Sequence, residues 1–338
     1  MKAIRLFFLA LIFLNFSCSS EAQKINGLSF VASGDSLSVK EVAPVVRSNA
    51  NYVALMPFGF IRNLSEPKIR FNEQRQWYGE KREGVIQYAN KFRNKNIKVM
   101  LKPQIWVWGG QYTGFIEMDS EEKWKQLETS YEAFILLYAE LAQEINADIL
   151  CIGTELEKFV LNRPEYWKSL IQKIRNVYKG KLTYASNWDE FKRVTFWNQL
   201  DYIGVDAYFP LTNSQSPTIE EFELGWKPHK EQIKTVQEAH QKPILFTEFG
   251  YRSIDYTGKE PWVSNRVEGS INLEAQSNGL QAIYNQFWKE DWFAGGFVWK
   301  WFLKHERVGG EKNNRFTPQN KPAEELLRKL YGVKNASN

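Results

Sequence analysis

Cysteine and histidine are scarce in this sequence, whose 338 residues include only two cysteines and three histidines. Cys18 lies near the N-terminus and Cys151 lies inside an apolar run, so no disulfide framework is expected and Cys151 is expected to be an inert core residue. His229, His240 and His305 are scattered, and no His-Glu-x-x-His motif or paired-cysteine site occurs. Zinc sites need such clusters. The sequence therefore predicts no metal.

Several signature motifs are also missing. The sequence contains no Gly-x-Ser-x-Gly motif and no Gly-x-x-x-x-Gly-Lys-Ser/Thr loop, and no Gly-x-Gly-x-x-Gly turn follows its first strand-like segment. These absences argue against an esterase with a nucleophile elbow, a P-loop nucleotide site and a dinucleotide fold. No organic cofactor is predicted.

The excess of one charge sign is small. The chain has 44 Lys and Arg against 39 Asp and Glu, a net charge of +5, and Lys2 and Arg5 account for two of these charges. Basic and acidic residues are interleaved almost everywhere, whereas nucleic-acid binding needs a clustered basic face. The sequence predicts no nucleic-acid partner.

Aromatic residues, in contrast, are abundant. The chain has 13 Trp, 15 Tyr and 23 Phe, which make up 15% of its residues. Trp and Tyr pack in cores, and their flat faces also stack on sugar rings or on bases. With nucleic acids disfavoured by the charge pattern, a sugar ligand is the expected use of the aromatic residues that reach the surface.

The N-terminus resembles an export signal. Met1–Arg5 is basic and is followed by the apolar run Leu6–Leu14, which is too short for a stable membrane span. Residues 1–18 are predicted to be a lipoprotein-type signal peptide with Cys18 as the lipidated residue. The alternative is cleavage near Ala22, which gives a soluble secreted protein. Either way the protein is expected outside the cytoplasm, in a bacterial cell envelope or secreted, and a lipid anchor is the only membrane contact predicted.

From residue 24 to residue 335 the chain alternates short apolar runs with longer amphipathic ones, without an obvious linker. We expect one (β/α)8 TIM barrel domain, because strands that are apolar throughout are typical of parallel strands covered by helices. An open, doubly wound sheet is the alternative. The eight predicted strands are Ile25–Val31, Tyr52–Pro57, Lys98–Ile105, Ile149–Gly153, Leu182–Ser186, Tyr202–Ala207, Ile244–Thr247 and Gly296–Trp299, and the eight predicted helices are Ser38–Asn49, Arg82–Lys95, Asp119–Ile145, Pro164–Tyr178, Asp189–Trp197, Ile219–His240, Leu273–Lys289 and Pro322–Leu330.

The chemistry of such a barrel lies at the C-terminal ends of its strands. The fourth predicted strand ends in Gly-Thr-Glu155-Leu-Glu157 and the seventh in Thr-Glu248-Phe-Gly-Tyr. Two carboxylates that face each other across the mouth can hydrolyse a glycosidic bond, one as nucleophile and the other as a proton donor whose pKa its negative neighbour raises. Glu155 and Glu248 are the predicted pair, and Glu157 is a weaker rival to Glu155.

These two motifs resemble those of glycoside hydrolase family 113, and the resemblance covers essentially the whole mature chain. It implies a retaining (β/α)8 glycosidase that cleaves β-1,4-mannan or manno-oligosaccharides without a cofactor. By the same resemblance Glu155 is the acid/base and Glu248 the nucleophile. Much of the clan has Asn before the acid/base, where it bonds the 2-hydroxyl of the sugar, and Thr154 occupies that position. Either Thr154 or another residue takes the role.

Further substrate-binding candidates follow the predicted strands. Tyr208 is expected to hydrogen-bond the nucleophile, Arg252 either to orient Glu248 or to form a surface ion pair, and Trp299 to lie under the sugar beside the cleavage point. Of the 13 tryptophans, six fall at or after strand ends, including Trp108 and Trp262. The other substrate-binding candidates are Trp106, Asn187, Trp188, Asp206 and Trp301.

Two alternatives remain open from the sequence. One is a carbohydrate-binding barrel that has lost catalysis, and the other is an enzyme of the same clan that acts on another β-linked polysaccharide such as glucan or xylan. In each case the partner is a polysaccharide or oligosaccharide, and the chain is expected to be a monomer.

Overall fold

The computed structural model describes residues 23–264 and 269–333 of the chain. The predicted signal peptide and Cys18 lie outside the described residues, so their predictions are not tested by the fold. Within the described part, the two longest amphipathic stretches predicted from the sequence are helices α3 (Glu121–Glu144) and α6 (Ile219–His240).

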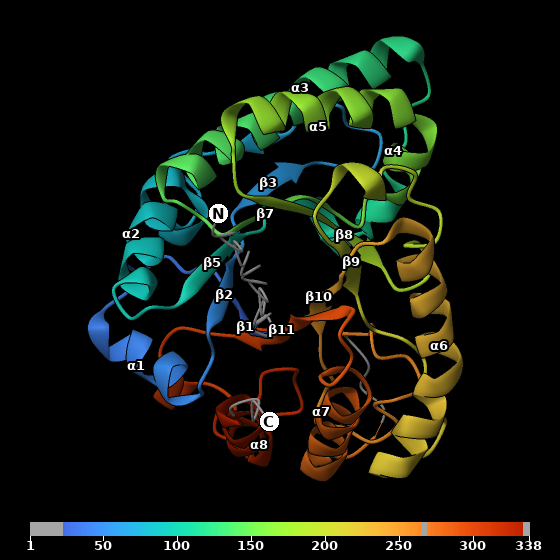
Figure 1. Ribbon diagram of the computed structural model, residues 1–338. Helices are drawn as coiled ribbons and strands as arrows, with labels where there is room; N and C mark the ends of the chain where they lie inside the picture. The colour runs from blue at the N-terminus through green and yellow to red at the C-terminus, as the bar shows by residue number, and fades with distance from the viewer. Residues whose placement is uncertain (1–22, 265–268, 334–338) are drawn as a thin grey trace, which may run out of the picture.

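Eight parallel strands close into a barrel in the order β1-β11-β10-β9-β8-β7-β5-β2, with helices around its outside (Figure 1). This confirms the predicted (β/α)8 barrel and excludes the open sheet, because β1 pairs with both β2 and β11. The barrel strands are β1 (Ile25–Phe30), β2 (Tyr52–Leu55), β5 (Lys98–Leu101), β7 (Ile149–Thr154), β8 (Lys181–Asn187), β9 (Ile203–Asp206), β10 (Ile244–Phe249) and β11 (Phe293–Trp301).

Seven of the eight strands are followed by at least one α-helix in the described part of the chain. The predicted helix Asp189–Trp197 is wrong: the segment after β8 forms turns and the 3-10 helix η4 (Trp197–Gln199). Its N–H groups bond three residues back from Glu190 to Asn187 and from Arg193 to Glu190, and only Phe191 bonds four residues back, to Asn187. The Glu190 side chain accepts the N–H of Asn187, a local contact of the kind that competes with a helix. The other helices are α1 (Val39–Arg47), α2 (Arg82–Arg93), α4 (Glu157–Asn162), α5 (Pro164–Val177), α7 (Leu273–Phe287) and α8 (Pro322–Gly332).

The predicted strand Lys98–Ile105 is in fact two strands. The barrel strand β5 ends at Leu101, and β6 (Gln104–Val107) begins after Lys102 and Pro103. Pro103 has no N–H to donate, which interrupts the ladder. β6 joins β3 (Phe58–Ile61) and β4 (Arg70–Phe71) in a separate three-stranded sheet, with β3 central. This rim sheet stands where β2 and β5 end, on the side of the barrel where parallel-barrel sites form.

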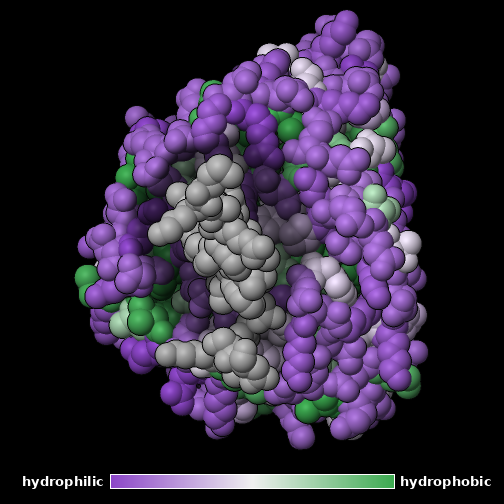
Figure 2. Space-filling view, in the orientation of Figure 1, coloured by the Kyte–Doolittle hydropathy of each residue, from purple (hydrophilic) through white to green (hydrophobic). Residues whose placement is uncertain are grey.

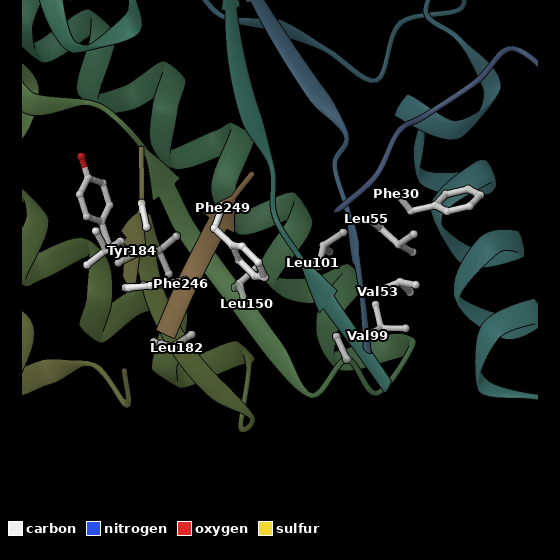
Figure 3. Packing of buried hydrophobic residues seen from close by; sticks show 14 of the residues in the cluster. Phe30, Val53, Leu55, Val99, Leu101, Leu150, Leu182, Tyr184, Phe246 and Phe249 are labelled. Atoms are coloured by element: carbon white, nitrogen blue, oxygen red, sulfur yellow. The ribbon is translucent and has the colours of Figure 1, made fainter. Parts of the chain in front are cut away.

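The core has two layers. A small cluster, which includes Ala54, Met100, Cys151 and Phe297, fills the barrel interior, and the expectation that Cys151 is a buried core residue is confirmed. The larger cluster lies between the strands and the helices. Figure 3 shows its side chains from successive strands, such as Val53 and Val99, in contact along the outer wall of the barrel. On the face of the molecule drawn in Figure 2, most of the coloured residues are hydrophilic.

The closure of the barrel between β1 and β11 depends on a glycine. Gly295 has φ +117°, and a Cβ on it would lie 2.2 Å from the carbonyl oxygen of Ile25. Both the backbone conformation and the close approach of the two strands therefore exclude a side chain here.

We expect Gly295→Ala to lower the free energy of unfolding by about 3 kcal/mol, since it adds a backbone clash to the cost of a positive φ. Gly310 is the matched control, because it has φ +82° and a Cβ added to it would meet nothing within 4 Å. Gly310→Ala should cost only about 1 kcal/mol. Urea denaturation followed by circular dichroism measures both, and equal losses would contradict the role assigned to the β1–β11 contact.

Candidate active site

Two glutamates stand at the mouth of the barrel. Glu155 directly follows β7, the fourth barrel strand, and Glu248 lies on β10, the seventh. Because parallel strands end on the same side, both lie on the face that the sequence predicted. The negative charge of Glu248 contributes to the raised pKa of Glu155, so the two carboxyl groups interact electrostatically.

The Glu248 carboxylate is almost fully buried, with 6% of the residue exposed, and it accepts hydrogen bonds from three described side chains. Lys102 Nζ lies 2.5 Å and Gln104 Nε2 3.1 Å from Oε1, while the Tyr208 hydroxyl donates to Oε2 at 2.8 Å. The predicted hydrogen bond from Tyr208 is confirmed. Together the donors fix the position and orientation of the carboxylate.

Lys102 is wholly buried and has a second carboxylate partner, Asp206, at 3.3 Å. Burial alone would disfavour the ammonium form, but Asp206 and Glu248 outweigh it and raise the pKa of Lys102. Thr247 Oγ1 donates to Asp206 at 2.7 Å. Asp206 has none of its surface exposed, which corrects the prediction that it contacts substrate: it pairs with Lys102 instead. Burial and then the charge of Glu248 raise the pKa of Asp206 to about 7.

Glu155 has an unusual backbone, with φ +50° in the left-handed region. The conformation is held by a bond from its N–H to the Ala185 carbonyl at 2.8 Å and by Thr113 Oγ1, which donates to the Glu155 carbonyl at 3.1 Å. Non-glycine residues in this region are frequent at functional sites. Burial, followed by the charges of Asp206 and Glu248, raises the pKa of Glu155 well above its usual value. Glu155 is therefore suited to carry a proton.

A third buried carboxylate, Glu190, supports the segment next to Glu155. The Tyr184 hydroxyl donates to Glu190 Oε1 at 2.8 Å and itself accepts the N–H of Leu156 at 2.8 Å. Glu190 Oε2 accepts the N–H of Asn187 at 3.1 Å. Burial raises the pKa of Glu190 to about 7. Glu190 thus ties the loop after β8 to the residue that follows Glu155.

Sequence reasoning missed Lys102, Gln104 and Glu190. Lys102 and Gln104 fell inside the single strand expected over residues 98–105, whereas site residues were expected only after the end of a strand. The available signal was Pro103, which ends a strand and makes its neighbours strand-end residues. Glu190 lay in a segment expected to be helical.

The polar candidates next to the glutamates differ in their surroundings. Asn187 is half-buried, and its Nδ2 donates to Asp189 at 3.1 Å. Thr154 Oγ1 is buried and has no hydrogen-bond partner in the described part of the chain. Arg252 is also buried, which corrects the surface position considered for it, and its Nε donates to the Asn314 carbonyl at 3.1 Å.

Several predicted aromatic platforms do lie at the mouth. Trp106 on β6 is 48% exposed. On the opposite loops, Trp188 stacks on Trp262 with ring centroids 5.2 Å apart and an interplanar angle of 21°. Trp299 is half-buried near the end of β11, and Lys300 Nζ lies 4.8 Å from the centroid of its ring.

The prediction that Trp301 binds substrate is wrong, because Trp301 is 1% exposed and belongs to the core between barrel and helices. Simple alternation along β11 places Trp299 and Trp301 on one side. The register between β1 and β11 shifts, however, so that Leu28 pairs with Val298 and Phe30 with Trp301. The shift turns Trp301 to the outer face, on which Phe30 packs against Tyr88.

A cavity of about 1060 Å³ opens over the rim sheet beside Lys300. Its wall combines aromatic and charged residues, and no group of three or more metal-ligating side chains occurs in the described chain. The lining residues are Val31, Phe58, Phe60, Ile61, Arg62, Glu66, Lys68, Arg70, Glu73, Arg75, Gln76, Trp77, Glu80, Trp106, Trp108, Lys300 and Phe302.

We expect Glu248→Gln to lower the pKa of Glu155, because it removes a negative charge that disfavours ionisation of Glu155. Carbon-13 NMR titration of the glutamate carboxyl groups measures the change. Glu157→Gln is the control, since Glu157 pairs with Arg193 and does not contribute to the shift at Glu155. An unchanged pKa in the Glu248 variant would contradict the coupling of the two groups.

Known proteins show the same architecture. The chain matches the solved structure of a GH113 β-1,4-mannanase with a TM-score of 0.80 at 21% identity, over 92% of this chain and 100% of the other. It matches the GH113 β-mannanase AaManA from Alicyclobacillus acidocaldarius, in complex with ManMIm, with a TM-score of 0.79 at 24% identity, over 91% and 97%. A β-glucuronidase from Ruminococcus gnavus is more distant, with a TM-score of 0.56 at 16% identity over 88% and 46%.

No curated protein sequence matches the chain significantly. The model of Glycoside Hydrolase Family 113, in contrast, matches residues 34–321, which include every barrel strand except β1. The protein therefore belongs to glycoside hydrolase family 113.

Proposed function

We propose that this glycoside hydrolase cleaves β-1,4-linked mannan or manno-oligosaccharides by double displacement, with Glu248 as nucleophile and Glu155 as acid/base. The observation that carries the proposal is the contrast between the two carboxyl groups. Glu248 accepts three hydrogen bonds, one of them from a buried ammonium group, whereas Glu155 is placed where burial and negative neighbours favour its protonated form. A retaining glycosidase needs one carboxylate and one carboxylic acid in these roles.

In the first step the Glu248 carboxylate attacks the anomeric carbon while Glu155 protonates the departing glycosidic oxygen. The resulting ester neutralises Glu248. One of the charges that raise the pKa of Glu155 then disappears, so Glu155 becomes more acidic once the leaving group has taken its proton, and its carboxylate is the form that can accept a proton from the attacking water. The charge on Glu248 thereby switches Glu155 between its two roles within one cycle.

The mannan specificity rests on relatives, and the length of the substrate rests on the cavity. The two GH113 structures reported above are named as β-1,4-mannanase and β-mannanase. The cavity of about 1060 Å³ is at the upper end of small-molecule sites, and Trp106 and Trp108 supply stacking faces along it. Neither glutamate lines this cavity, but Trp106 lies two residues from Gln104, which donates to Glu248. These features support a substrate of several sugar units that extends from the glutamates over the rim sheet.

Export and lipidation at Cys18 remain proposals from the sequence alone, because the residues concerned lie outside the described ranges. Among the described helices, none combines the length and hydrophobicity that crossing a membrane requires.

Glu248→Ala should lower kcat on soluble β-1,4-mannan by about three orders of magnitude or more, because it removes the nucleophile. Release of reducing ends measures kcat, and circular dichroism checks that the variant is folded. Glu157→Ala is the control and should retain most of the activity. If the unmodified protein binds manno-oligosaccharides without releasing reducing ends, it is a binding protein and the proposal fails.

The first sugar released should keep the β-configuration, as followed by proton NMR of the anomeric signal during the initial minutes. In a crystal structure the carboxyl groups of Glu155 and Glu248 should lie about 5–5.5 Å apart, which leaves no room for a water between nucleophile and sugar. An inverted product together with a separation of about 9 Å would exclude double displacement.

A further inference from the structure

The cavity over the rim sheet has an unusual concentration of positive charge for a protein of nearly balanced composition. Five of its lining residues are Lys or Arg and four are Glu or Gln, of which three are Glu. Four of the cations come from one short stretch of chain that spans β3, β4 and the loops beside them. These five residues, which we term the basic wall, are Arg62, Lys68, Arg70, Arg75 and Lys300.

No residue of the basic wall has an ion pair in the described part of the chain, although pairs are frequent elsewhere on the surface. Arg163, for example, bonds both Glu121 and Glu128. Lys300 contacts aromatic rings, with its Nζ 4.8 Å and 5.3 Å from the ring centroids of Trp299 and Phe302. The positive charges of Arg62, Lys68, Arg70 and Arg75 are thus available to a ligand. Burial lowers the pKa of Lys300, and its ammonium group interacts with the charge of Glu248.

The nearby glutamates offset the charge of the wall only in part, because three of them face five basic residues. Glu66 Oε1 accepts the N–H of Lys68 at 3.2 Å, and Glu80 Oε2 accepts the N–H of Trp77 at 3.2 Å. Both carboxyl groups therefore have local backbone partners. Burial also raises the pKa of Glu80 above its usual value. Only Glu73 remains as an exposed acid without such a bond from its side chain in the described structure.

Aromatic faces share the cavity with these cations. Arg70 pairs with Phe60 across the antiparallel strands β4 and β3, and both line the cavity. Trp106 and the 78% exposed Trp108 border it from β6 and the residues just beyond. Such a wall can stack on sugar rings and hold an anionic group on the same chain, since guanidinium groups bind carboxylates through two parallel hydrogen bonds.

A neutral mannan offers only hydroxyl groups and gives no reason to leave the four cations around β3 and β4 unpaired. We propose that the natural substrate is a β-1,4-linked mannan that carries acidic groups. Its carboxylate-bearing units bind the basic wall, while Glu155 and Glu248, which do not line this cavity, act on a linkage further along the same chain. The cleavage part of this inference rests on the proposed function, whereas the binding part does not.

The test compares β-1,4-manno-oligosaccharides with the same oligosaccharides after partial oxidation of their C6 hydroxyl groups to carboxylates. Binding is measured by titration calorimetry on the Glu155→Gln variant, and kcat/KM on the active protein. The charge-reversal variant is Arg70→Glu/Arg75→Glu. Its matched control is Lys95→Glu/Lys289→Glu, which reverses two exposed charges in the loops that precede β5 and β11, at the other end of the barrel.

We expect the oxidised oligosaccharides to bind on the order of tenfold more tightly than the neutral ones, with the preference weakened by salt. Arg70→Glu/Arg75→Glu should abolish the preference and the control should keep it. Equal binding of both ligands, an unchanged preference in the charge-reversal variant, or equally effective competition by polyglutamate would overturn the proposal. If neither ligand is hydrolysed but the binding preference holds, the proposed function fails and the acidic ligand stands.

Discussion

The buried ammonium group of Lys102 is the interaction on which the mouth of this barrel depends. It lies between Asp206 and Glu248, which come from the sixth and seventh barrel strands, and is itself placed directly after the third. Two neighbouring carboxylates in so little solvent would repel each other and lose their hydration. A single cation offsets both costs, and removing one member of such a group leaves an uncompensated buried charge.

The same charge arrangement explains why two chemically identical side chains differ. Glu248 receives Lys102, Gln104 and Tyr208 as donors, so its position is fixed by three different strands or loops. Glu155 is held instead through its backbone, and the negative charges of Asp206 and Glu248 raise the pKa of its carboxyl group. The two glutamates thus differ only in their surroundings. Those surroundings are set by the residues that follow the third, fourth and sixth barrel strands.

Much of this molecule follows from its sequence. Strands such as Ile149–Thr154 are apolar almost throughout, which is typical of parallel strands covered on their outer face, and the spacing of the two glutamates follows from repeated β/α units. Prediction failed where a local detail overrides periodicity. Pro103 splits a strand, a register shift turns Trp301 outward, and bonds around Asn187 replace a helix with turns. Lys102 was missed because its partners are distant in sequence.

The rim sheet has a consequence for how substrate preference changes in such a protein. Gln104 and Trp106 are two residues apart on β6 and therefore face the same side of the strand. The first holds Glu248 and the second borders the cavity. A shift of β6 that improves the fit of a new sugar also moves a donor to the reacting carboxylate. Selection on this strand therefore acts on affinity and turnover jointly, whereas parts of the cavity wall that do not contact Glu248, such as the β3–β4 loop, can diversify without that cost.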